Sequence, residues 1–221
     1  MKTEAGVRGG GVDRFLTTHF SMIESISCRF GKRGYSSLLR VISGTLKGKK
    51  LFSAKGLSLR PTSDRVRESV FDILQGIPEG LRVLDLFAGT GAMGIEALSR
   101  GAAAAVFIEN HPSSLEVLRK NLTVCRLEGV SEVLAKEAEE GLQFLEGRGR
   151  SFELVFLDPP YGKGLARSIL KKLAGSALLK PETLIVAEHA SAEEVEGFLP
   201  LQRVDFRKYG STRISFFRKM G

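Results

Sequence analysis

The fold is decided by the stretch Asp85-Leu86-Phe87-Ala88-Gly89-Thr90-Gly91-Ala92-Met93-Gly94. It follows an apolar run typical of a buried strand and precedes a helical pattern. Glycines in this position allow a tight turn and let a ligand approach the backbone at the amino end of the helix. The glycines fit the GxGxxG pattern, and Glu109 lies 20 residues after Gly89 at the end of the next apolar run. The stretch therefore predicts a ligand site on a strand–turn–helix unit.

Apolar runs alternate with helical patterns from Leu81 onward. This order predicts an α/β fold with a mostly parallel, doubly wound sheet. Gly210-Ser211 separates two further runs, which predicts that the sheet ends in an antiparallel strand pair. The predicted strands are Arg82–Leu86, Ala104–Glu109, Val130–Ala135, Glu153–Asp158, Leu184–Glu188, Leu201–Tyr209 and Thr212–Phe217. The predicted helices span residues 92–100, 112–126, 138–146, 164–174 and 191–197.

The residues ahead of this sheet predict an arm and a small extension. Residues 1–37 are basic and interrupted by glycines, so we expect a poorly ordered arm. Residues 38–76 predict a β-hairpin, from runs at 39–43 and 49–53, followed by a helix. Thr62 or Ser63 can cap that helix. Its apolar face is formed by Val66, Ser69, Val70, Ile73 and Leu74, with Arg65, Arg67, Glu68 and Asp72 off this face. The main domain is then residues 77–221.

Composition and charge limit the class of protein. The chain has 221 residues, of which 43% are hydrophobic and 26% charged, values that argue against extensive disorder. No apolar run approaches the roughly 18 residues of a membrane span. Cys28 and Cys125 are far apart and neither belongs to a CxxC pair, so we expect no disulfide framework, no metal site and a reducing cytoplasm.

Positive charge is concentrated at the two ends of the chain. The net charge is +8, with ten basic and three acidic residues in 1–50 and six basic and one acidic in 201–221. The middle of the chain is mildly acidic. Clustered positive charge indicates a polyanionic partner such as nucleic acid, although a solvated basic surface would have the same composition.

The glycine turn leaves two cofactors open. NAD places a pyrophosphate at the helix end, where a nearby anion is unfavourable. Asp85, four residues before the first glycine, favours a cationic and phosphate-free ligand such as S-adenosylmethionine. We expect Asp85 at its amino-acid end and Glu109 at its ribose. The predicted cofactor set is completed by Phe87, Gly89, Gly91, Asn110, and Glu137 with Ala138 at the adenine. A solvated glutamate explains Glu137 almost equally well.

A second loop predicts the chemistry. Asp158-Pro159-Pro160-Tyr161 follows the fourth strand, at the sheet edge where open α/β sheets bind ligands. The prolines fix the backbone and remove two donors, which leaves the Asp158 carboxylate and the Pro159 carbonyl as acceptors. Two acceptors can hold both N–H groups of an exocyclic amine, and Tyr161 can stack on the base. These four residues therefore predict methyl transfer to a base amine, against the alternative of a rigid turn.

Several motifs together resemble one family, the bacterial 16S ribosomal RNA guanine-N2 methyltransferases of the small-subunit methyltransferase D type. The resemblance covers about residues 39–219 and implies a Rossmann-like class I fold with S-adenosylmethionine as cofactor. It implies that the substrate is the N2 amine of one guanine in 16S rRNA, within a 30S subunit or assembly intermediate. It also implies RNA or entrance contacts by Arg60, Thr62, Arg65 and Arg67. The motifs are Arg40–Gly44, Arg60–Glu68, the run from Asp85, Glu109-Asn110, Asp158–Tyr161, Glu188-His189 and Lys208–Thr212.

Charge adds a predicted basic rim around the pocket. It includes Lys47, Lys49 and Lys50 of the hairpin and Lys208 of the tail, with Arg203, Arg207, Arg213, Arg218 and Lys219. We expect a monomer, because no apolar segment is left over. Three alternatives stay open: adenine-N6 methylation of DNA or RNA, an NAD-dependent oxidoreductase, and RNA binding without catalysis.

Overall fold

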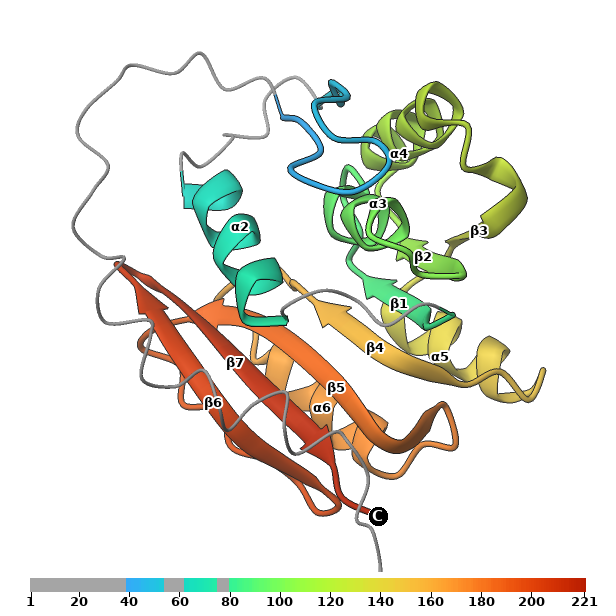
Figure 1. The fold of residues 1–221 in the computed structure, drawn as a ribbon. Helices are drawn as coiled ribbons and strands as arrows, with labels where there is room; N and C mark the ends of the chain where they lie inside the picture. The colour runs from blue at the N-terminus through green and yellow to red at the C-terminus, as the bar shows by residue number, and fades with distance from the viewer. Residues whose placement is uncertain (1–38, 54–61, 75–79) are drawn as a thin grey trace, which may run out of the picture. The chain divides into compact units, whose positions relative to one another are not determined.

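A seven-stranded sheet organises the computed structural model, which describes residues 39–53, 62–74 and 80–221 (Figure 1). The strand order is β3-β2-β1-β4-β5-β7-β6. β1 to β5 run parallel, and β7 pairs antiparallel with both β5 and β6. This confirms the predicted sheet; the predicted arm lies outside the described residues. The strands are β1 Arg82–Leu86, β2 Ala104–Glu109, β3 Ser131–Ala135, β4 Phe152–Leu157, β5 Leu179–Ala190, β6 Leu201–Tyr209 and β7 Thr212–Lys219.

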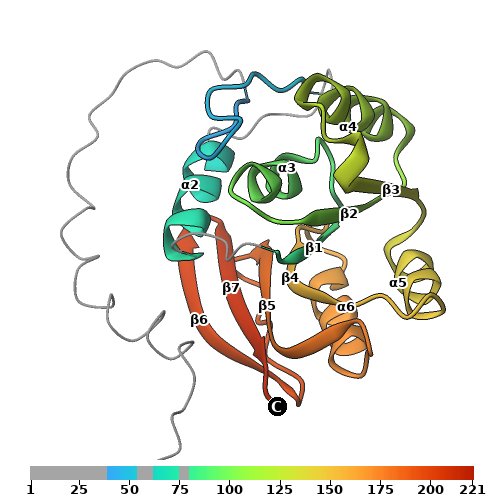
Figure 2. The ribbon, with the colours of Figure 1, turned by 45° about the vertical axis from the view of Figure 1, so that its right-hand side comes forward.

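Helices pack on both faces of the sheet (Figure 2). α2, α3 and α4 contribute to one hydrophobic core, and α5 and α6 to the other. In β4, Leu154 and Phe156 belong to the first core, whereas Val155 and Leu157 belong to the second. Because both faces are covered, the strand reads as an unbroken apolar run. The helices are α2 Thr62–Leu74, α3 Ala92–Ser99, α4 Pro112–Cys125, the 3-10 turn η2 Glu128–Val130, α5 Ala138–Glu146 and α6 Leu165–Ala174.

Two predicted elements were wrong in extent or type. β5 begins at Leu179 rather than Leu184, because its first residue pairs with Phe152 before a shift in register. The helix predicted over 191–197 is not formed in this described segment. Val195 is fully buried there and its carbonyl accepts a hydrogen bond from Arg203 at 3.0 Å. Tertiary contacts therefore override the local helical pattern.

The extension over residues 39–53 forms less sheet than predicted. It contains one isolated bridge, between Arg40 and Lys50, in place of two strands. The backbone N–H groups of Ile42 and Ser43 instead donate to the Glu96 carboxylate at 2.7 and 2.9 Å. Glu96 is fully buried in α3, so these bonds attach the extension to the main domain and leave fewer donors for a ladder.

The carboxyl ends of the central strands lie at the same level. Leu86 at the end of β1 faces Ile108 of β2 on one side and Leu157 of β4 on the other. Leu157 in turn faces Ala187 of β5. The segments that follow these strands therefore emerge side by side, and the glycine turn after β1 lies beside the loop after β4.

Candidate active site

The glycine turn after β1 contains left-handed backbone conformations, which glycine adopts more readily than other residues. Phe87, Gly89 and Gly91 have positive φ angles of 59°, 55° and 78°. A Cβ added at Gly91 would lie 2.4 Å from Leu118 Cδ1, so this glycine is required by packing as well as by conformation. A Cβ added at Gly89 would have its nearest neighbour at 3.9 Å, the Phe87 carbonyl oxygen. The space above Gly89 is therefore open to a ligand.

Glu109 fixes this turn against the end of β2. Its Oε2 accepts the Gly89 N–H at 2.8 Å, and its Oε1 accepts the N–H groups of Asn110 and His111 at 2.9 and 2.7 Å. Glu109 is 9% exposed. Carboxylate oxygens have further lone pairs, so this arrangement can also accept hydroxyl donors.

Asp85 lies beneath the turn rather than at its surface. It is 3% exposed, and its Oδ2 accepts the Gly94 N–H at 2.9 Å. Burial raises the pKa of Asp85 to about 7; the Gly94 hydrogen bond opposes that rise and the charge of Glu109 adds to it. An acidic side chain beneath the glycine turn disfavours a pyrophosphate and suits a cationic ligand. S-adenosylmethionine, which carries a sulfonium and an ammonium group, fits these residues.

The predicted adenine side of the site is assembled at the ends of β2 and β3. The Asn110 side-chain amide donates a short hydrogen bond to Glu137 Oε1. The backbone of Lys136 also donates to the Glu109 carbonyl at 3.1 Å. Ala138 is buried at the first residue of α5, whereas Glu137 is exposed. The structure thus brings together Glu109, Asn110 and Glu137, which are far apart in the sequence.

The Asp158–Tyr161 loop follows β4 next to the glycine turn. The Asp158 N–H lies 3.4 Å from the carbonyl of Leu86, the last residue of β1. Asp158 and Pro160 are exposed, Pro159 is buried and Tyr161 is half-buried. The loop therefore presents an acidic side chain beside the cofactor turn while Pro159 anchors it in the protein.

Tyr161 is held through its hydroxyl. The O–H donates to Glu188 Oε1 at 2.6 Å, and Thr212 Oγ1 lies at hydrogen-bond distance, 2.9 Å. Burial and the hydrogen bond to Glu188 raise the pKa of Tyr161 to about 12, so the phenol stays protonated at neutral pH. Glu188 is near the end of β5 and Thr212 begins β7, so two further strands hold the ring.

Sequence reasoning missed three residues that support these loops. Glu188 and Thr212 stood in recognised motifs but had no assigned role. Asn121 was missed entirely; it is buried in α4, and its amide donates to the Thr90 carbonyl at 2.9 Å and the Phe52 carbonyl at 3.1 Å. A polar residue within the apolar stripe of a helix was the available signal for Asn121.

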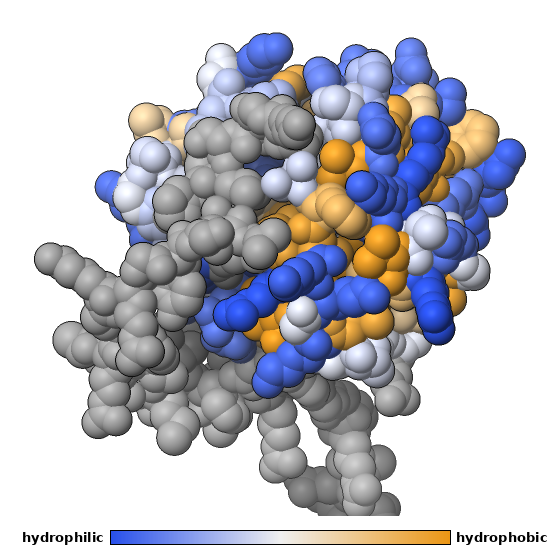
Figure 3. All heavy atoms as spheres, turned by 90° about the horizontal axis from the view of Figure 1, so that it is seen from above, coloured by the Kyte–Doolittle hydropathy of each residue, from blue (hydrophilic) through white to orange (hydrophobic). Residues whose placement is uncertain are grey.

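The predicted RNA-contact residues divide into two groups. The exposed ones are Lys47, Lys49, Lys50, Arg65 and Lys208. Arg67 differs from expectation: it is 4% exposed and donates to the Arg40 carbonyl at 2.6 Å, so it packs the extension against α2. Thr62 is the first residue of α2, and Arg60 lies outside the described residues. Seen from the side of the 39–53 segment and α4, hydrophilic side chains border an apolar area (Figure 3).

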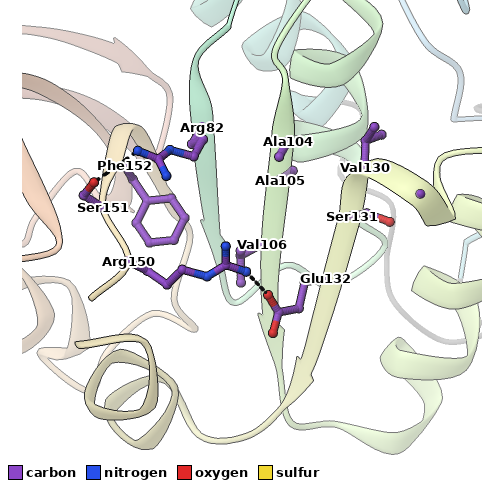
Figure 4. A pocket seen from close by; sticks show the side chains of 11 residues that line it. Arg82, Ala104, Ala105, Val106, Val130, Ser131, Glu132, Arg150, Ser151 and Phe152 are labelled. Atoms are coloured by element: carbon purple, nitrogen blue, oxygen red, sulfur yellow. Dashed lines mark hydrogen bonds and ion pairs between the residues drawn. The ribbon is translucent and has the colours of Figure 1, made fainter. Parts of the chain in front are cut away.

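A separate hollow of about 280 Å³ lies at the amino ends of the strands (Figure 4). Its charged lining includes Arg82, Glu132 and Arg150, and Arg150 forms an ion pair with Glu132 at 2.5 Å. This edge is opposite the two loops, so the hollow is not part of the candidate active site. Among the described residues, no helix has the length and apolarity to cross a bilayer, and no three His, Cys, Asp or Glu side chains are grouped to bind a metal.

A glycine turn over acidic strand ends, beside an Asp-Pro-Pro-Tyr loop on a mostly parallel sheet, defines a class I S-adenosylmethionine-dependent methyltransferase. Comparison with known proteins agrees. The family model described as "Conserved hypothetical protein 95" matches residues 39–218. Ribosomal RNA small subunit methyltransferase D of Escherichia coli is 39% identical over 165 residues, which are 75% of this chain and 79% of that protein. The chain belongs to this methyltransferase D family, and its cofactor is S-adenosylmethionine.

Solved structures and a further relative support the assignment. The E. coli protein yhhF, named as a candidate methyltransferase, has a TM-score of 0.72 and 32% identity, covering 84% of this chain and 99% of that one. YlbH of Bacillus subtilis, named as a candidate rRNA methyltransferase, is 36% identical over 83% of this chain and its own full length. An RNA methyltransferase of Salinibacter ruber, solved with S-adenosyl-L-homocysteine, shares the fold at 17% identity, 72% and 94% coverage and a TM-score of 0.56. The oxidoreductase alternative is set aside.

Proposed function

We propose that this protein methylates 16S ribosomal RNA at the exocyclic N2 amine of a guanine. The names of its relatives support rRNA methylation as the general reaction. The observation that carries the proposal is the placement of the Asp158–Tyr161 loop beside the cofactor turn, where the Asp158 N–H meets the Leu86 carbonyl. One edge of the sheet therefore carries both the turn for the methyl-donating cofactor and a loop rich in hydrogen-bond acceptors for the substrate amine.

Asp158 and Pro159 are the residues that would hold the amine. The Asp158 carboxylate and the Pro159 carbonyl can each accept one N–H, which leaves the nitrogen facing the cofactor. When bound, the cofactor would supply an electrophilic sulfonium methyl group, whose transfer would form the N–C bond while the C–S bonding electrons return to sulfur. Correct positioning of reacting groups can supply about 7–11 kcal/mol of the barrier.

Tyr161 would fix the plane of the guanine. Its ring follows the two prolines, and its hydroxyl is bound at Glu188 and Thr212, so both ends of the loop are restrained. The chemistry needs no strong base, because the amine loses its proton to solvent after the methyl attack. His189 is consistent with this view: it is 1% exposed and hydrogen-bonded to Ser215 at 2.9 Å.

The proposed substrate is the 30S subunit or an assembly intermediate. We propose that this protein acts on it as a monomer in the cytoplasm. The exposed lysines of the 39–53 segment and of β6 support a phosphate-rich partner. A guanine within a helix would have to be turned out to reach the loop, and an aromatic residue such as Tyr161 would help to hold it there.

Substitution of Asp158 tests the proposal. Asp158→Ala should lower methyl transfer to unmodified 30S particles by at least about 100-fold, because an acceptor for the amine is lost. Asp158→Asn keeps one acceptor oxygen and should lose less activity than Asp158→Ala. Cofactor affinity, measured by calorimetry, should stay within about threefold. Asp72→Asn, which changes an exposed carboxylate on α2, is the matched control. Normal turnover in Asp158→Ala would refute the assignment.

A further inference from the structure

The edge strand β6 exposes an aromatic ring next to two arginines. Phe206 is 47% exposed. The guanidinium of Arg203 lies 5.4 Å from the centre of its ring, and that of Arg213, on β7, lies 5.2 Å away. Both distances are within the range of cation–π contact. We call Arg203, Phe206 and Arg213 the β6 platform.

The surroundings of the β6 platform are strongly basic. Residues 201–221 contain six basic side chains and one acidic, Asp205. Asp205 forms an ion pair with Arg207 at 2.5 Å and Glu182 one with Arg218 at 3.7 Å, so these two carboxylates offset part of the positive charge. Lys208 is exposed on the same strand. An exposed aromatic side chain in a positive field suits an anionic polymer that carries flat rings.

The strand that carries the β6 platform leads directly to the catalytic loop. Tyr209 at the end of β6 pairs with Thr212, whose hydroxyl binds Tyr161. Phe206 precedes Tyr209 by three residues, about 10 Å along a strand. Because three residues separate them, Phe206 and Tyr209 face opposite sides of the sheet. β6 is the last strand of the sheet, so an RNA segment with its target base at Tyr161 can reach Phe206 by passing around this edge.

We propose that the β6 platform stacks an unpaired base of the RNA outside the target nucleotide, at the edge of the sheet. This inference rests on the proposed function, since it assigns a further contact to the same substrate. Proteins that bind single-stranded RNA stack its bases on aromatic rings and on arginine guanidinium planes, often on an open sheet surface. The platform supplies both kinds of plane, and the neighbouring lysine and arginines supply the charge for the phosphates.

The test compares three variants on β6. Phe206→Ala removes the ring, Phe206→Tyr keeps it, and Val204→Ala truncates another exposed side chain of the same strand as a control. Binding is measured with fluorescently labelled, unmodified 16S rRNA, and KM with unmodified 30S particles. Phe206→Ala should weaken RNA binding about 5- to 150-fold, the range for loss of one stacked base, whereas the other two variants should bind like wild type.

Salt dependence separates stacking from charge. Phe206→Ala should leave the slope of log K against log salt unchanged, because no phosphate contact is lost. Lys208→Gln should reduce the size of that slope by about 0.7–0.9, the value for one neutralised phosphate. A change of slope in Phe206→Ala would contradict the stacking role.

Three other results would overturn the inference. Phe206→Ala could bind RNA as well as Val204→Ala does. It could convert an oligomer to a smaller species in sedimentation, which would make the platform a contact between copies. It could lower Tm without any effect on RNA, which would make Phe206 a packing residue. If wild type methylates no RNA at all, the proposed function fails instead, so the two failures are distinguishable.

Discussion

Replacing Tyr161 by Phe tests whether the catalytic loop depends on the hydrogen bonds of the Tyr161 hydroxyl. The change removes one oxygen and keeps the aromatic ring. That oxygen donates to Glu188 at 2.6 Å and lies 2.9 Å from Thr212 Oγ1. A hydrogen bond to a charged acceptor contributes about 1.5–3 kcal/mol net, and the half-buried position of Tyr161 points to the lower end of this range.

This magnitude sets the expected kinetic effect. If loss of these hydrogen bonds destabilises the reactive conformation of the loop by about 1.5–2 kcal/mol, the rate of methyl transfer at saturating cofactor should fall by roughly 10- to 30-fold. The assay is single-turnover transfer of labelled methyl groups to unmodified 30S particles. Cofactor affinity should not change, because the Tyr161 hydroxyl lies on the side of the site proposed for the substrate guanine. Tyr209→Phe is the matched control, since it removes a hydroxyl bonded to Ser69 rather than to the catalytic loop.

A spectroscopic readout separates anchoring from a general loss of stability. Ionisation of Tyr161, followed at 295 nm as the difference between wild type and Tyr161→Phe, should occur near pH 12. Glu188→Gln should lower that pKa, because it removes the negative charge that opposes formation of the phenolate. Wild-type transfer rates in Tyr161→Phe, or an equal loss in Tyr209→Phe, would refute the anchoring role.

The remaining predictions concern the glycine turn and the extension. The pKa of Asp85 is raised from 3.8 to about 7, so the ligand-free protein should lose stability as pH rises through 7. At pH 8, Asp85→Asn should therefore be more stable than wild type by about 2–4 kcal/mol. The same variant should bind the cofactor more weakly than wild type. Gly91→Ala should lower Tm by roughly 4–15 °C through its positive φ and the 2.4 Å approach to Leu118, whereas Gly89→Ala should affect cofactor affinity more than Tm. Glu96→Leu should cost about 3–5 kcal/mol and speed amide exchange at Ile42, because its buried carboxylate holds the extension and Arg100.

Each of these predictions has a direct check. Thermal unfolding between pH 4 and 9 tests Asp85, and equal pH profiles for wild type and Asp85→Asn would contradict the burial argument. Calorimetry with cofactor tests the two glycines, and a larger Tm loss at Gly89 than at Gly91 would reverse their assigned roles. Exchange measured by mass spectrometry tests Glu96, where unchanged protection over residues 39–53 would show that other contacts hold the extension.

The two functional loops were predictable because each is contiguous in the sequence. The glycines after β1 and the prolines after β4 impose their backbone geometry locally, and the parallel sheet then places both loops at one edge. Glu109 was also predictable, since it stands at a fixed spacing after the turn. Residue type and spacing were sufficient for these positions.

The supporting contacts depend on register, which the sequence does not specify. Glu188 and Thr212 are 27 and 51 residues from Tyr161, and they meet it only because β5 and β7 are neighbours. Arg67 was placed off the apolar face of its helix, yet it is buried because its guanidinium binds the Arg40 carbonyl of the 39–53 segment. The helix expected over residues 191–197 does not form, because Val195 is buried by tertiary contacts instead.

The identity of the methylated nucleoside is the most direct test of the central claim. Unmodified 30S particles, naked 16S rRNA and DNA are incubated with labelled S-adenosylmethionine and the wild-type protein, then digested to nucleosides. The proposed function predicts label in N2-methylguanosine, with Asp158→Ala as the inactive control. Label in N6-methyladenosine, or no label in any nucleic acid by a protein that binds the cofactor, would contradict it.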